Sequence, residues 1–160
     1  MLNKDNEYML GLYAMGAEYQ KKRDELKAEK KEIAAKYGYG SAEMQEWYEK
    51  DKALQWPFKP GECKAFIAWQ DSIDQGLADL VMNDFLWDNE VEDFLRTLHA
   101  AGIKSFVYTN SSTASMDNIH AFVENRCDLF GPCTITKKAM RFGSETEEKV
   151  FGLRFTLLFL

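Results

Sequence analysis

The chain has 160 residues, of which 46% are hydrophobic and 29% charged. This composition predicts one folded domain, or a small domain with a helical appendage, and excludes a disordered chain. Three cysteines at irregular spacing form no disulfide framework and favour a reducing compartment, the cytoplasm. No apolar stretch reaches the roughly 18 residues that a membrane-spanning helix needs.

Two helices are predicted near the N-terminus, over residues 4–36 and 42–54, and together they form an αα-hairpin. The first helix carries a heptad-like apolar seam over 8–33, which Lys22 and Glu29 interrupt. Such a seam packs either on the second helix or on another copy of the chain.

The rest of the sequence alternates between predicted helices and strands. In chain order we predict a helix over 62–76, a strand over 77–83, a helix over 89–101 with Asp88 as its N-cap, a strand over 103–108, a helix over 113–125, and strands over 128–139 and 147–158. This order predicts an α+β fold in which a β-α-β-α-β-β domain with a mixed sheet follows the N-terminal helices. We therefore expect a helical hairpin over 1–60 and an α+β domain over 61–160, or one continuous core across both.

The net charge of −6 belongs to one part of the sequence. Residues 61–103 hold nine acidic residues and only two basic ones, a local net charge of −7. Aromatic side chains lie between these carboxylates, and a surface of one sign with aromatic anchors suits protein binding and repels nucleic acid. The alternative is a solvated face that binds nothing. The predicted protein-binding residues are Asp71, Asp74, Asp79, Asp84, Phe85, Trp87, Asp88, Glu90, Glu92 and Asp93.

A hydroxyl-rich turn over 109–113 is the main candidate for chemistry. The start of a helix can hold an anion, but the glycines and the lysine of a phosphate-binding loop are missing, and a helix cap explains the residues equally. No cysteine or histidine has zinc spacing, and the carboxylates over 84–93 lack the pattern of a calcium loop. We therefore predict no catalytic residue, metal or cofactor. A Cys–His pair would have to be assembled by the fold from Cys63, His99, His120, Cys127 and Cys133.

Four segments of the C-terminal half have a familiar pattern: Trp87-Asp88-Asn89-Glu90-Val91-Glu92, Ala101-Gly102-Ile103-Lys104-Ser105-Phe106, Thr109-Asn110-Ser111-Ser112-Thr113 and Gly152-Leu153-Arg154-Phe155. In these segments the chain resembles small uncharacterised accessory proteins of mobile genetic elements in gut Firmicutes. The resemblance brings no active-site residue with it. It implies a setting in which small acidic proteins often inhibit host defence, including the RNA-guided nucleases that anti-CRISPR proteins inhibit.

These observations lead to one principal expectation. The chain is a non-enzymatic inhibitor that docks its acidic surface, as a nucleic-acid mimic, on the basic groove of a nucleic-acid-processing defence protein. Two alternatives stay open: a structural module that forms a homodimer through the helix over 8–33, and a small enzyme that uses the hydroxyl-rich turn Asn110–Thr113 with a cysteine or histidine nearby. We expect no direct contact with nucleic acid or a membrane.

Overall fold

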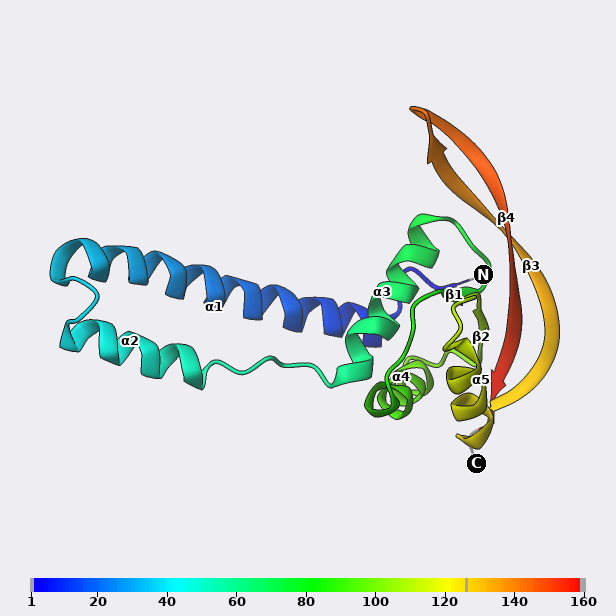
Figure 1. Cartoon of the computed structure of the whole chain (residues 1–160), viewed down its shortest axis with the longest axis horizontal. Helices are drawn as coiled ribbons and strands as arrows, with labels where there is room; N and C mark the ends of the chain where they lie inside the picture. The colour runs from blue at the N-terminus through cyan, green and yellow to red at the C-terminus, as the bar shows by residue number, and fades with distance from the viewer. Residues whose placement is uncertain (1, 126, 159–160) are drawn as a thin grey trace. The chain divides into compact units, whose positions relative to one another are not determined.

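The structure, a computed structural model, describes residues 2–125 and 127–158. It divides the chain into two compact units (Figure 1). The helical unit is Gly11–Phe58, and the α+β unit combines residues 2–10 with residues 59–158. The predicted α+β class, with helices ahead of a mixed sheet, is confirmed.

The helical unit is an αα-hairpin of two helices, α1 (Glu7–Tyr37) and α2 (Ala42–Ala53). The first residues of α1, up to Leu10, belong to the α+β unit. Ser41 caps α2, because its hydroxyl accepts the Met44 N–H at 3.1 Å. Across the hairpin, the Trp47 indole donates to the Leu26 carbonyl at 2.7 Å. The Glu29 carboxylate accepts from Lys50 at 2.8 Å, so a polar residue of the predicted seam is used in pairing the two helices.

The α+β unit continues with α3 (Pro60–Asp74), β1 (Leu80–Met82), α4 (Asp88–Ala100), β2 (Ser105–Tyr108), α5 (Ser115–Glu124), β3 (Cys127–Arg141) and β4 (Ser144–Leu157). The strand order in the sheet is β1-β2-β4-β3. Strands β1 and β2 are parallel, as the intervening α4 crossover allows, and the other neighbours are antiparallel. Of the helices that the structure describes, none has the length and apolar character needed to cross a bilayer.

An aromatic cluster forms the core between the sheet and the helices α4 and α5. Phe94 of α4 and Phe122 of α5 lie against Phe106 of β2 and Phe155 of β4, and all four side chains are fully buried. Their ring centroids are 5.0–5.5 Å apart for the contacts that cross from helix to sheet, a spacing at which edge-to-face pairs are favourable. On the opposite face of the sheet, a smaller cluster contains Val81, Val107 and Ile135.

Strands β3 and β4 are longer than predicted and meet in a two-residue turn. Phe142 and Gly143 have φ angles of 51° and 77°, the positive values that a type I′ turn requires at both positions. Strand β2 pairs with β4 only through Tyr108↔Leu153 and the three pairs before it. The hairpin residues 133–152 therefore continue past the carboxyl end of β2 as a two-stranded ribbon, which we call the arm (Figure 1).

The start of α4 differs from the prediction. Asp88 is its first helical residue, and Trp87, with an extended backbone, is the N-cap. The reason is a side chain three residues into the helix: the Glu90 carboxylate accepts the Trp87 N–H at 2.8 Å and so fixes the chain one residue earlier.

Candidate protein-binding surface

The loop between β1 and α4, residues 83–87, exposes a large aromatic side chain at the carboxyl end of β1. We call it the Trp87 loop. The Trp87 side chain is 65% exposed, although a tryptophan of the same chain, Trp69, is 2% exposed. Phe85 is half-buried and supports Trp87 edge-to-face, with the ring centroids 5.2 Å apart. An exposed tryptophan on a supporting ring is typical of a binding anchor.

The middle of the Trp87 loop is fixed to the core through a buried amide. Leu86 is fully buried, and its N–H donates to Asn118 Oδ1 at 2.9 Å. Asn118 Nδ2 donates back to the Leu86 carbonyl at 2.6 Å, and the Tyr108 hydroxyl donates to Asn118 Oδ1 at 2.8 Å. Because Asn118 is 2% exposed, these bonds are made away from competing water.

A lysine from α3 connects the loop to the first turn of α4. Lys64 Nζ donates to the Phe85 carbonyl at 2.6 Å and to the Glu90 carboxylate at 2.7 Å. The same carboxylate accepts the Trp87 N–H, so Lys64, Glu90 and the loop backbone form one network. The loop is therefore held in one conformation before any partner binds, which lowers the entropic cost of binding.

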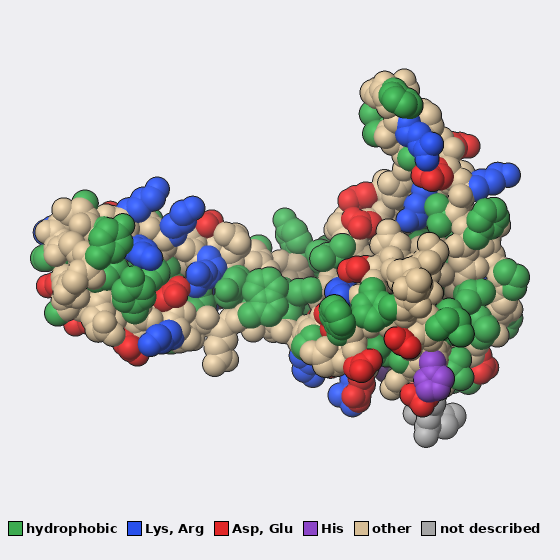
Figure 2. Space-filling model, viewed as in Figure 1, with side chains coloured by type: hydrophobic (Ala, Val, Ile, Leu, Met, Phe, Trp, Pro, Cys, Tyr) green, Lys and Arg blue, Asp and Glu red, His purple; other side chains and the backbone are tan. Residues whose placement is uncertain are grey.

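Two carboxylates flank the aromatic anchor on the surface. The side chains of Asp84 and Asp88 are exposed on either side of it in sequence. Asp84 Oδ1 accepts the Phe85 N–H at 2.8 Å, and its other oxygen is 3.8 Å from Lys64 Nζ. Figure 2 shows acidic side chains among apolar ones on the face of the α+β unit turned toward the viewer.

The sequence predicts a surface of one sign, but Asp79, Glu90 and Glu92 are paired with basic residues, as is Asp84 at the longer distance of 3.8 Å. Asp79 holds Arg154 of β4 through two hydrogen bonds of 3.0 and 2.9 Å, and this partner raises the pKa of the guanidinium. Glu90 pairs with Lys64, and Glu92 with Arg96 one turn further along α4. These three carboxylates serve the fold more than a partner.

The remaining acidic residues divide between two elements. Asp93 is half-buried on α4. Asp71 and Asp74 are exposed on the last turns of α3, where they line an open cleft of about 450 Å³ together with Asn83 and Lys137. The predicted residues therefore do not form one continuous field, and the part beside the anchor consists of Asp84, Phe85, Trp87 and Asp88.

The hydroxyl-rich turn lies next to the Trp87 loop and braces it. Asn110 Nδ2 donates to the Asn83 carbonyl at 3.0 Å, and the Thr109 N–H donates to the Met82 carbonyl at 2.9 Å. Asn110 Oδ1 accepts from both the N–H and the hydroxyl of Ser112, at 2.9 and 2.7 Å. The turn uses its polar groups internally and on the neighbouring loop.

Among the cysteines and histidines, Cys127 is buried and both histidines are exposed. Burial, with a smaller contribution from Asp128, raises the pKa of Cys127 to about 11, so that its thiol is protonated at neutral pH and is a poor nucleophile. His120 is exposed, 3.6 Å from Glu124 on the same helix, and His99 is exposed at the end of α4. Within the described residues, no group of three or more His, Cys, Asp or Glu side chains could hold a metal ion.

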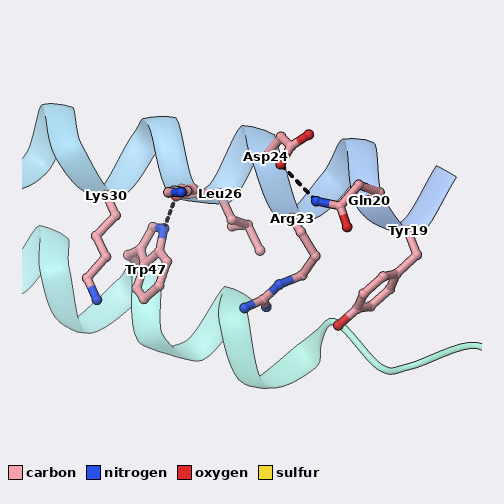
Figure 3. Close-up of a pocket in the computed structure, with 8 residues that line it drawn as sticks. Tyr19, Gln20, Arg23, Asp24, Leu26, Lys30 and Trp47 are labelled. Atoms are coloured by element: carbon pink, nitrogen blue, oxygen red, sulfur yellow. Dashed lines mark hydrogen bonds between the residues drawn. The ribbon is translucent and has the colours of Figure 1, made fainter. Parts of the chain in front are cut away.

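The helical unit has an open cleft of about 460 Å³ of its own, between α1 and α2 (Figure 3). Arg23 in this cleft pairs with Asp51 at 2.6 Å, and Lys30 lies 4.7 Å from the centre of the Trp47 ring. Gln20 donates to Asp24 at 2.9 Å. Arg23 and Lys30 thus contact α2, whereas Gln20 and Asp24 pair within α1. The whole unit is electrically neutral, with nine acidic and nine basic residues.

Sequence reasoning missed the residues that hold the loop, above all Lys64, Tyr108 and Asn118. The sequence does contain a signal for Asn118. This amide lies one helical turn before Phe122, on the same face of α5, and Phe122 is fully buried. A polar residue on such a face has to find hydrogen-bonding partners inside the protein. The identity of those partners depends on the fold.

The fold and the Trp87 loop define the class of the protein: a small α+β domain, with a helical hairpin attached, that presents a preorganised aromatic loop. Residues 64–157 match DUF7698, a domain of unknown function, and the chain belongs to this family. The matched region begins at Lys64 and contains the Trp87 loop, Asn118 and the arm, but not the helical unit. No curated protein and no solved structure matches the chain.

Proposed function

We propose that this protein is a non-enzymatic binding protein that docks the Trp87 loop and its flanking carboxylates on a basic surface of a partner protein. The observation that carries the proposal is the exposure of Trp87 on a loop that is tied down on both sides. A soluble fold gains little from a large exposed aromatic ring, whereas a rigid tryptophan is the commonest kind of energetic anchor at interfaces.

The charge distribution supports a basic partner. The helical unit is neutral, so the net charge of −6 lies entirely in the α+β unit. A field of this sign steers positively charged surfaces toward the protein and repels nucleic acid. The grooves with which proteins hold nucleic acid have that positive charge. The resemblance to accessory proteins of mobile elements favours a host-defence protein, such as an RNA-guided nuclease, as the partner to be inhibited.

The test compares partner capture by three forms of the full chain. Wild-type protein, the Trp87→Ala variant and the double variant Asp84→Asn/Asp88→Asn are immobilised and exposed to a lysate of host cells, and the bound proteins are identified by mass spectrometry. The affinity of each purified partner is then measured against the same forms. We expect both variants to bind about tenfold or more weakly, the loss typical of an interface anchor. We also expect affinity to fall with added salt because exposed charges are screened.

A matched control is the double variant Glu43→Gln/Glu46→Gln. It removes the same number of charges from exposed positions of α2, in the neutral helical unit. Binding should be unchanged in this variant. If all four proteins bind a partner equally, the Trp87 loop is not the docking surface. Competition by nucleic acid distinguishes mimicry from binding elsewhere on the partner: a mimic is displaced by the partner's own nucleic acid.

A further inference from the structure

The inner edge of β4 within the arm has free backbone groups. Arg141 and Ser144 flank the two-residue turn, and from there hydrogen-bonded and non-hydrogen-bonded residue pairs alternate along the ladder. Every second residue of β4 therefore turns its N–H and C=O groups away from β3. The Leu157 N–H points toward β2, because it donates to the Lys104 carbonyl at 2.8 Å. The odd-numbered residues of β4 are therefore the ones whose backbone groups point away from β3. The residues with outward backbone groups in the arm are Glu145, Glu147, Lys149 and Phe151.

No strand occupies that edge among the described residues. Strand β2 ends opposite Leu153, and the side chains of the four residues are exposed, Phe151 by 76%. Gly152 marks the end of the covered part, because a Cβ there would lie 2.8 Å from the Tyr108 carbonyl oxygen. The free edge therefore begins where β2 stops, at the same end of the sheet as the Trp87 loop, because β1 and β2 are parallel.

The other edge of the same hairpin is protected. The register shifts between Leu129 and Gly131, and Pro132 has no N–H to offer. Further along, the Lys138 N–H is already taken by the Gln75 side chain at 2.9 Å. Bulges, prolines, covering elements and charged side chains, above all lysine, are the devices that keep edge strands from pairing with other chains. Over residues 144–152 the inner edge of β4 has no proline and no register shift, and its protection is limited to the charges of Glu145, Glu147 and Lys149.

A second copy of the chain fits this edge poorly. An antiparallel copy centred on Glu147 places that carboxylate opposite its own counterpart, although Glu145 then faces Lys149, and a shift toward the tip places Glu145 opposite Glu147. A shift in the opposite direction places the turn of the second copy against the end of β2, where Tyr108 pairs with Leu153 of β4. The α+β unit also has a net charge of −6, which opposes self-association. A lysine or arginine side chain on an added strand would instead face Glu147 favourably, while Glu145 already has Lys138 as an ionic partner at 3.3 Å.

We propose that an extended, basic segment of the partner protein adds to the sheet as a strand along the inner edge of β4, over residues 145–151. This inference rests on the proposed function and extends it: the partner's backbone hydrogen-bonds to the arm while Trp87 anchors a neighbouring surface. Strand addition of this kind derives affinity from main-chain hydrogen bonds and specificity from alternate side chains.

The probe for this inference is a ten-residue peptide of alternating lysine and valine, with blocked ends, and its affinity for the full chain is measured by fluorescence anisotropy. The Glu147→Pro variant removes one outward N–H without touching the bonds to β3. The Glu147→Val variant removes the same charge but keeps the N–H. We expect the proline variant to bind about tenfold more weakly than the valine variant, because a main-chain bond is lost at the docking edge.

A second form of the peptide, N-methylated at alternate residues, tests the same point on unaltered protein and is expected to lose binding. Circular dichroism verifies that the proline variant is folded. Equal binding by the proline and valine variants and by both peptides overturns strand addition, as does the absence of peptide binding. The proposed function is tested separately by the Trp87→Ala capture experiment. If the peptide experiment excludes strand addition but the Trp87→Ala variant still fails to capture a partner, the Trp87 loop remains the docking site.

Discussion

Leu86 and Asn118 bind each other in both directions, with the Leu86 N–H 2.9 Å from Asn118 Oδ1 and the Leu86 carbonyl 2.6 Å from Asn118 Nδ2. One side chain of α5 thereby replaces the strand partner that the chain lacks after β1. The aromatic ring of Trp87 follows directly after this fixed point, so the position of the proposed anchor is determined by a buried residue 31 positions later in the sequence.

Replacing Asn118 should therefore cost much of the stability of the domain. In Asn118→Ala, the N–H and carbonyl of Leu86 and the hydroxyl of Tyr108 lose their buried partner, and unsatisfied buried groups are expensive. We expect the free energy of unfolding, measured with urea, to fall by about 3 kcal/mol. The control is Asn125→Ala at the exposed end of α5, where the loss should stay below about 1 kcal/mol. Equal losses in the two variants would contradict the proposed role of Asn118.

Gly61 allows α3 and α4 to approach each other at the backbone. A Cβ at this position would overlap the carbonyl oxygen of Glu90 and the amide nitrogen of Phe94. We expect Gly61→Ala to lower the free energy of unfolding by about 3 kcal/mol, since backbone atoms cannot move aside without separating the helices. Gly40→Ala is the matched control, because nothing lies within 4 Å of its added Cβ. A neutral Gly61→Ala would mean that the two helices are further apart in solution.

The sequence predicted the elements well because their patterns are local. The helices α3, α4 and α5 and the strand β2 follow from apolar spacing, and α3 and α4 also from Gly76 and Gly102 at their ends, features that a window of about 15 residues contains. The arm was underestimated because its polar residues, such as Glu145 and Glu147, do not alternate with apolar ones. Cross-strand ion pairs, including Lys138–Glu145, stabilise it instead.

The charge surface could be predicted only in part, for a physical reason. A run of carboxylates without an intervening basic residue is visible in the sequence. The basic residues that pair with Asp79 and Glu90 come from outside this run. Lys64 reaches Glu90 from α3, and Arg154 reaches Asp79 across 75 positions of sequence. Such pairs exist only once the sheet has formed. The sequence places Trp87 among carboxylates as a surface anchor, but the contacts that hold its loop, from Lys64 and Asn118, depend on the fold.

Cys127 should react slowly and with a distinct pH dependence. Its thiol pKa is raised from 9.0 to about 11, so its thiolate fraction at pH 8 is about a hundredfold lower than that of an ordinary thiol. In a Cys63→Ser/Cys133→Ser variant, we expect iodoacetamide to alkylate Cys127 about a hundredfold more slowly in the native state than in urea. The native rate should rise with pH up to about 11. Similar rates in both states would show that the site is open to solvent.

The same shift makes the fold sensitive to alkali. Because the pKa of Cys127 is higher in the folded state, its contribution to stability is complete below pH 9 and is lost as the pH rises toward 11. Tyr108 behaves alike at higher pH, since burial raises its pKa from 10.0 to about 12. The free energy of unfolding should decline from pH 9 upward, and less steeply between 9 and 11 in Cys127→Ala. An identical slope in the variant would exclude Cys127 as a cause.

Hydrogen exchange in the free protein tests the geometry of the arm without any partner. The amides of Thr146, Glu148 and Val150 point toward β3, whereas those of Glu145, Glu147, Lys149 and Phe151 point away from it. Amide exchange followed by NMR should therefore alternate along β4, with at least about a tenfold difference between neighbouring residues.

Strand β4 provides its own control for this measurement. Residues 153–156 are paired on both sides, with β2 and β3, and should exchange slowly without alternation. Slow exchange at all residues of the arm would mean that another chain already covers the edge, and the second copy would have to be reconsidered as its occupant. Fast exchange throughout would mean that the arm is not formed in solution, which removes the physical basis for strand addition. Alternation that stops at Gly152 is the result that leaves a free edge available to a basic partner.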